Sequence, residues 1–310
     1  MLRRREVLKG LGNMALALAV PPRTFAQPID LETQYLREGV FVVRGPDANA
    51  LAFVTDEGVA LVDGGSPTWA PQLQAAIARA TGERAVHALI NTHWHPEQVG
   101  SNEMLGSSGV EIIAHDNTRS WLSTEVRQRW SGRRYPPLPE QARPNSTVYD
   151  SEERVVGGKP LYLGYALHAH TDGDLYVYLP KENILFAGGF LTNDSWPVID
   201  WWTGGWTGGM LNAFDAILPL CDADTVVVPS SGALMSYQQF REQREMYLTI
   251  FEKIHQGFVK SLGPDEIVQT QPTAGYRPEW GEPDLFVTLA VQSLHGHLRG
   301  GVGGWLPRIP

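Results

Sequence analysis

Short runs of hydrophobic residues, separated by glycine and aspartate, dominate the first part of the chain. Residues 40–43, 50–54 and 59–62 are rich in valine, leucine, alanine and phenylalanine. Runs of this length between turn residues predict β-strands, and their close spacing predicts that the strands are antiparallel. Residues 71–81 then place Leu73, Ala76, Ile77 and Ala80 on one face, which predicts an amphipathic helix.

Further along the chain, from residue 88 onward, a second series of strands and helices is predicted. The apolar run at residues 88–90 predicts a buried strand that ends in the polar loop 91–100. Residues 117–148 are polar and lack strong periodicity, so we expect a helix and a loop there. Other strands are predicted at residues 111–115, 160–167, 175–179, 184–190 and 225–228, and helices at residues 210–220, 236–259 and 285–294.

The first 26 residues have the pattern of a targeting segment. Three arginines at residues 3–5 precede the apolar run at residues 14–20, and small residues near Ala26 offer a cleavage site. Paired arginines before an apolar run are typical of a twin-arginine signal, although an ordinary secretion signal or an uncleaved anchor has the same outline. The run is too short for a stable membrane span. We therefore expect a periplasmic or secreted protein.

The composition of the chain argues against one class of partner and one class of metal site. The chain has 25 basic and 34 acidic residues, for a net charge of −9, and no cluster of lysine and arginine stands out beyond the N-terminus. A nucleic-acid partner is therefore not expected. The single Cys221 excludes an intramolecular disulfide framework and a cysteine-based zinc site.

The loop 91–100 contains the strongest candidate chemistry. His93 and His95 are separated by one residue at the mouth of a predicted strand, so both imidazoles can reach one metal ion. Zinc suits neutral imidazole, and catalytic zinc usually has three protein ligands and a water. A third ligand would have to come from elsewhere in the chain. Taken alone, a His-x-His pair is a weak signal, because most histidines have ordinary structural roles.

The loop 91–100 carries one of two sequence motifs that strengthen the case for a metal site. Thr92-His93-Trp94-His95 followed by the acidic Glu97, and the later His170-Thr171-Asp172-Gly173-Asp174, resemble signatures of the metallo-β-lactamase superfamily. The resemblance covers roughly residues 35–260. It implies an α+β fold, the αββα sandwich, with two facing mixed β-sheets and outer helices. We expect this domain to occupy residues 27–262, with residues 263–310 as a C-terminal extension packed on it.

The resemblance also implies roles for individual residues. His170 takes the position of the third metal ligand, and Asp63 that of a group beneath the metal, although a turn aspartate that caps the next helix is an equal alternative. The positions that would hold a second metal carry Glu97, Gln98, Gly189 and Ser231. These side chains cannot complete a second four-coordinate zinc site. We therefore expect one zinc per chain, with iron as a possible substitute, held by His93, His95 and His170.

The resulting hypothesis is a zinc hydrolase that cleaves an ester, lactone, thioester or amide in a small-molecule substrate. Glu97 would act as general base, and Gln98 or Ser231 would donate a hydrogen bond. Trp201 and Trp202 belong to a tryptophan-rich loop, residues 196–206, which predicts either apolar substrate contact or packing. The alternatives are a catalytically inactive binding or accessory protein that keeps the fold, and a non-hydrolytic iron protein. The pattern assigns no role to His168 or to the pair His295 and His297, and it leaves the substrate and the oligomeric state open.

Overall fold

The structure, a computed structural model, describes residues 31–299. The predicted targeting segment at residues 1–26 lies outside the described residues, as does the end of the C-terminal extension. Among the described helices, none combines the length and the hydropathy that crossing a membrane requires.

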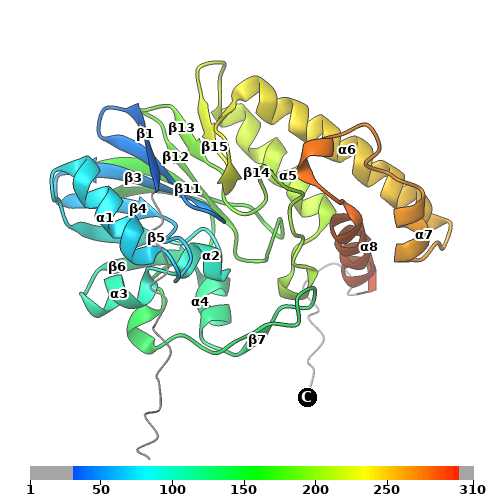
Figure 1. Cartoon of the computed structure of the whole chain (residues 1–310), viewed down its shortest axis with the longest axis horizontal. Helices are drawn as coiled ribbons and strands as arrows, with labels where there is room; N and C mark the ends of the chain where they lie inside the picture. The colour runs from blue at the N-terminus through cyan, green and yellow to red at the C-terminus, as the bar shows by residue number, and fades with distance from the viewer. Residues whose placement is uncertain (1–30, 300–310) are drawn as a thin grey trace, which may run out of the picture.

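A seven-stranded mixed sheet forms the first half of the domain (Figure 1). Its first four strands are antiparallel, the last three of them as the sequence predicts, and the fourth strand then begins a parallel series with the remaining three. In spatial order the strands are β1 (Glu32–Arg37), β2 (Val40–Arg44), β3 (Asn49–Thr55), β4 (Gly58–Val62), β5 (Val86–Ile90), β6 (Glu111–His115) and β9 (Ser146–Val148).

A six-stranded sheet faces the first one and is also mixed, since β13 and β15 run parallel while its other neighbours are antiparallel. Two pairs of two-residue strands complete the β structure. The six strands are β10 (Glu152–Val156), β11 (Lys159–Tyr165), β12 (Leu175–Leu179), β13 (Ile184–Phe186), β15 (Val226–Val228) and β17 (Met235–Ser236), and the short pairs are β7 (Val126–Arg127) with β8 (Arg134–Tyr135) and β14 (Thr192–Asn193) with β16 (Ser231–Gly232).

Helices cover the outer faces of both sheets (Figure 1). The helices near the first sheet are α1 (Ala70–Thr81), α2 (Pro96–Val99), α3 (Asn102–Ser107) and α4 (Asp116–Leu122). Those beside the second sheet are α5 (Thr207–Ile217), α6 (Tyr237–Val259), α7 (Pro264–Gln269) and α8 (Asp284–Arg299). Single 3-10 turns lie at Glu140–Ala142, Trp201–Thr203, Leu218–Leu220 and Pro278–Trp280. The predicted α+β class and the αββα sandwich are confirmed.

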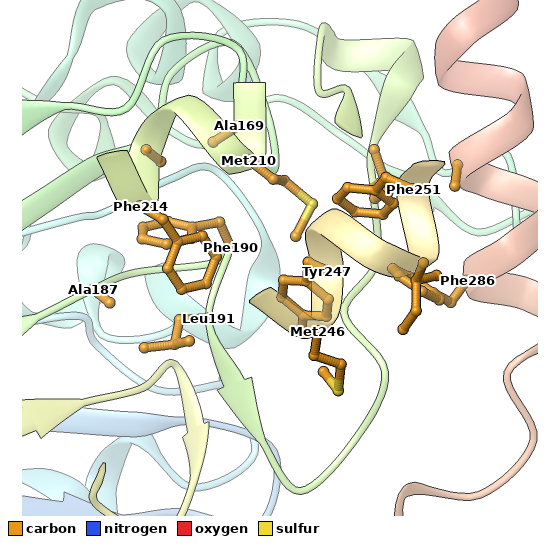
Figure 2. Packing of buried hydrophobic residues seen from close by; sticks show 14 of the residues in the cluster. Ala169, Ala187, Phe190, Leu191, Met210, Phe214, Met246, Tyr247, Phe251 and Phe286 are labelled. Atoms are coloured by element: carbon orange, nitrogen blue, oxygen red, sulfur yellow. The ribbon is translucent and has the colours of Figure 1, made fainter. Parts of the chain in front are cut away.

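Three apolar layers hold the sandwich together, as binary patterning of strands and helices requires. The central layer lies between the sheets and includes Phe53 and Phe186. A second layer joins the outer face of the first sheet to α1. A third joins the second sheet to α5, α6 and α8, and Figure 2 shows Phe214, Tyr247 and Phe286 packed within it.

The segment beyond residue 262 contributes to this third layer. Helix α8 contacts α5, α6 and the 3-10 turn Trp201–Thr203. Phe286 is buried and lies 5.2 Å from Trp196, ring centre to ring centre, in a stacked arrangement. The helix therefore supports the loop that leads from β13 to α5. The domain boundary itself, placed at residue 262 from the sequence, stays a prediction.

We expect Phe286→Ala to lower the free energy of unfolding by about 3–5 kcal/mol, because it opens a cavity where Phe286 is only 1% exposed. The neighbouring Leu285 is 46% exposed, so Leu285→Ala should cost less than about 1 kcal/mol. Denaturant unfolding of the two variants measures the difference. Equal losses would show that α8 does not belong to the cooperative core.

Candidate metal centre

Three histidine rings meet where a loop of the first sheet lies against a loop of the second. The candidate ligand nitrogens of His93, His95 and His170 all lie within 4.8 Å of one another, and the three residues are 1%, 5% and 4% exposed. Nδ1 of His95 and Nε2 of His170 face each other at 2.9 Å. His93 and His95 follow β5, whereas His170 lies between β11 and β12, so only the fold brings the third ring to the other two.

Main-chain contacts join the two sheets beside this centre. The amide of Leu175, the first residue of β12, donates to the carbonyl of Thr92 at 2.8 Å. Asp174 accepts hydrogen bonds from the amides of His170 and Thr171 and from the hydroxyl of Thr171. These bonds fix the turn that carries His170 directly against the loop that carries His93 and His95.

The second nitrogen of each ring is also bonded. Nδ1 of His170 donates to the carbonyl of Val198 at 2.6 Å, and Nε2 of His95 lies 3.2 Å from Oδ2 of Asp200. Nδ1 of His93 lies 3.0 Å from the hydroxyl oxygen of Thr92. Such partners fix the orientation and the tautomer of a ligating imidazole. The remaining nitrogens, one on each ring, therefore converge on a common point.

Burial favours the neutral form of two of these rings, His93 and His170. It lowers the pKa of His93 well below its usual range, with the neighbouring His170 and His95 as further causes. Burial also lowers the pKa of His170 to about 3, again with His95 adding to the effect. Neutral imidazole is the form that binds zinc. The cluster of three imidazole nitrogens therefore fits a zinc ion with one open coordination position.

Asp63 lies beneath this centre, at the end of β4. Its carboxylate accepts from the amide and from the hydroxyl of Thr92, each at 2.8 Å. Burial raises the pKa of Asp63 to about 8, and the two bonds from Thr92 oppose that rise. The alternative role as a helix cap is not observed, since the residue at the N-terminal boundary of α1 is Trp69. Asp63 instead holds the residue that contacts the ring of His93.

The four positions of the second metal differ in their surroundings. A Cβ atom at Gly189 would lie 2.5 Å from Cδ2 of His170 and 2.7 Å from Cε1 of His93, so the imidazole rings occupy the space of a side chain. Gln98 is buried, its Nε2 donates to the hydroxyl of Ser230 at 3.3 Å, and its Oε1 has no hydrogen-bond partner. Glu97 is half-buried in α2, two residues after His95 in sequence, but it is not among the clustered ligands.

The predicted substrate contacts Ser231, Trp201 and Trp202 each have a different partner. The hydroxyl of Ser231 donates to Asp194 at 2.7 Å, so Ser230 rather than Ser231 contacts Gln98. The indole N–H of Trp201 donates to Gln292 of α8 at 2.8 Å, which is a packing contact. Trp202 is half-buried, and its ring lies 3.5 Å beneath the guanidinium carbon of Arg129.

Two contacts with His95 were not expected from the sequence. Asp200 accepts from the hydroxyl of Thr203 at 2.6 Å and lies within hydrogen-bond distance of His95. Trp130 lies 5.7 Å from His95, ring centre to ring centre, and approaches from the turn between β7 and β8. An acidic residue inside the tryptophan-rich loop was the available signal for Asp200. No spacing pattern pointed to Trp130.

The other histidines singled out from the sequence lie outside the cluster of three. Nδ1 of His168 lies 3.1 Å from the carbonyl of Gly204. The ring of His297 stacks on Trp206 at 3.6 Å, whereas His295 contacts Phe258. His295 and His297 therefore face different partners and do not share one ligand position.

Comparisons with known proteins place this fold among metallo-β-lactamases. Over 163 residues the chain is 23% identical to metallo-beta-lactamase IND-1 of Chryseobacterium indologenes, and over 151 residues it is 27% identical to metallo-beta-lactamase type 2 of Bacteroides fragilis. These alignments cover 52% and 47% of this chain. The chain spans 62% and 53% of the length of these two relatives.

Solved structures show the same fold. A metallo-beta-lactamase from Pontibacter korlensis is similar with a TM-score of 0.58 and 20% identity, over 70% of this chain and 99% of its own. The sec-alkylsulfatase Pisa1 from Pseudomonas sp. is similar with a TM-score of 0.62 and 14% identity, over 90% of this chain and 51% of its own. The family model described as metallo-beta-lactamase superfamily matches residues 43–218, which is more than half of the sequence. The chain therefore belongs to the metallo-beta-lactamase superfamily.

Proposed function

We propose that this protein is a hydrolase with a single zinc ion, which cleaves an ester, lactone, thioester or amide bond in a small molecule. The observation that carries the proposal is the convergence of three buried imidazoles whose outer nitrogens are already bonded. When bound by three histidines, zinc lowers the pKa of a coordinated water to about 7 and supplies a nucleophile near neutral pH. Iron is the alternative metal.

The surroundings of the three rings support one metal rather than two. A second zinc would need a side-chain ligand at position 189, where Gly189 leaves only the space that His93 and His170 already fill. The amide of Gln98 is a poor zinc ligand, yet it is buried and keeps one free acceptor. Gln98 therefore forms a hydrogen bond with the substrate in this proposal and is not a metal ligand.

Glu97 is the proposed proton acceptor. It lies two residues beyond His95 on α2 and makes no side-chain hydrogen bond with another described residue, so its carboxylate is available. A carboxylate within reach of the attacking water can take its proton and return it to the leaving group.

Periplasmic location belongs to the same proposal and is supported by the twin-arginine pattern of residues 1–26.

Metal content is the first test of this proposal. We expect about one zinc per chain in the wild type and a loss of that zinc in His93→Ala and in His170→Ala, because two imidazoles rarely suffice for a zinc site. His255→Ala, which removes an exposed histidine on α6, should retain the metal. Elemental analysis of the purified, folded chains gives the comparison. No zinc after reconstitution of the wild type would instead favour the binding-protein alternative.

The contact between Asp200 and His95 gives a second prediction. Asp200→Asn keeps the size of the side chain but removes the negative charge that orients His95, so zinc affinity should fall by about tenfold to a hundredfold. Competition with a chelator of known affinity measures this change without any substrate. Asp215→Asn, which alters an exposed carboxylate on α5, serves as the matched control and should leave the affinity unchanged. Unaltered affinity in Asp200→Asn would rule out an orienting role.

The role of Glu97 gives a third prediction. Glu97→Gln should lower kcat by about a hundredfold, since the amide cannot accept the proton, while zinc content stays at the wild-type level. The measurement is turnover of chromogenic esters and thioesters by zinc-saturated enzyme. Turnover equal to that of the wild type would remove Glu97 from the mechanism and leave the metal site untouched.

A further inference from the structure

A short arginine-rich hairpin lies beside the metal centre. It comprises β7, the turn 128–133 and β8, and we call these residues, 126–135, the arginine hairpin. Four arginines fall within residues 127–134, in a chain whose net charge is −9. This basic cluster contradicts the expectation that none follows the N-terminus. All four side chains are exposed, and only Arg134 forms an ion pair with another described residue, Glu125, at 3.0 Å.

The arginine hairpin is anchored to the loop that carries the first two histidines. Val126 is buried with Trp94, Val99 and Leu122 in a small apolar cluster, and Tyr135 packs against the same cluster. Within the turn, Oε1 of Gln128 accepts from the hydroxyls of Ser131 and Tyr135. Because these hydrogen bonds close the turn and Val126 anchors the hairpin in an apolar cluster, the backbone of the hairpin is held in one position. In Figure 1 the hairpin runs along the lower edge of the molecule from α4 toward α8.

Two consecutive residues of this turn face the metal centre and its neighbouring loop. Trp130 lies 5.7 Å from the ring of His95. The guanidinium of Arg129 lies over Trp202, which follows Asp200 by two residues in the loop that bonds His95. The pair of Arg129 and Trp202 therefore lies at the edge of the site on the side of His95.

The chemistry of this pair suits an anion. A guanidinium stacked 3.5 Å over an indole ring gains a cation–π interaction and keeps its N–H donors free around its edge. Arg129 is exposed and forms no hydrogen bond or ion pair with another described residue. The planar fork of N–H groups matches a carboxylate, sulfate or phosphate. An orienting ring and unused donors are the features that a preorganised anion receptor needs.

We propose that Arg129, held on Trp202, binds an anionic substituent of the substrate while the scissile bond lies at the three histidines. This inference rests on the proposed hydrolase function and specifies its substrate class as a molecule with a carboxylate, sulfate or phosphate group beside the cleaved bond. Trp130 would then contact the apolar part of the substrate between the two ends. Arg129 acts in this proposal as a specificity-determining residue.

A matched pair of fluorescent probes tests the anion receptor without requiring metal. Anilinonaphthalene sulfonate and N-phenylnaphthylamine differ by one sulfonate, and both bind apolar surfaces. We expect the sulfonate to bind the full-length protein at least about tenfold more tightly, as one charge-assisted hydrogen bond implies. Arg129→Gln should abolish that advantage, and added salt should reduce it. Arg79→Gln, an exposed arginine on α1, should retain it.

Turnover then links the receptor to the reaction. With zinc-loaded enzyme, nitrophenyl hemisuccinate should have a higher kcat/KM than nitrophenyl acetate, and Arg129→Gln should lower that ratio by about tenfold with unchanged zinc content. An equal probe advantage in Arg129→Gln and in the wild type, or no advantage at all, overturns the proposal even when the neutral ester is hydrolysed. Retained Arg129-dependent probe binding in a protein without zinc or turnover would instead overturn the hydrolase function and keep the receptor.

Discussion

The whole site depends on the hydrogen bonds that hold three buried imidazoles by their outer nitrogens. A buried polar nitrogen without a partner costs about 1–3 kcal/mol, so three such rings in one place need three dedicated acceptors. The acceptors are Thr92, Val198 and Asp200, which lie on two different loops. With the outer nitrogens bonded in this way, the inner nitrogens present lone pairs to one another. A shared cation would relieve that repulsion, so the packing of the rings supports the proposed metal ion.

These hydrogen bonds can form only if the two sheets are held at a fixed separation from each other. The bond from the amide of Leu175 to the carbonyl of Thr92 fixes that distance at the site itself, and the apolar layer between the sheets maintains it elsewhere. Asp63 and Asp174 each tie down one of the two ligand loops from below. Both carboxylates have a raised pKa because they are buried. The protein thus keeps costly buried acids where they fix the backbone of the metal ligands.

Sequence reasoning reached the sandwich and the three histidines because both are encoded locally. The strands show their apolar runs, and each ligand loop carries a motif of its own. Asp200, Trp130 and Arg129 were missed because their importance comes from contacts between loops that are distant in the chain. Strands of two residues, such as β7 and β8, are too short to show any periodicity. Ser231 was assigned a hydrogen bond to the substrate, whereas its hydroxyl bonds Asp194 and the neighbouring Ser230 contacts Gln98, since the side chain that points inward depends on the turn.

Glycine at position 189 does more than remove a ligand. Because the rings of His93 and His170 lie where its side chain would be, an aspartate there could not be accommodated without moving one of the imidazoles. This packing supports the proposed single ion, and a single ion would offer less positive charge to a substrate than a pair would. Any negative charge on the substrate must then be met by the protein. The arginine hairpin places fixed positive charge at the edge of this same centre, in a chain that is otherwise acidic. Under the proposed function, the substituted positions of the second metal and Arg129 on Trp202 are thus complementary features of one binding site.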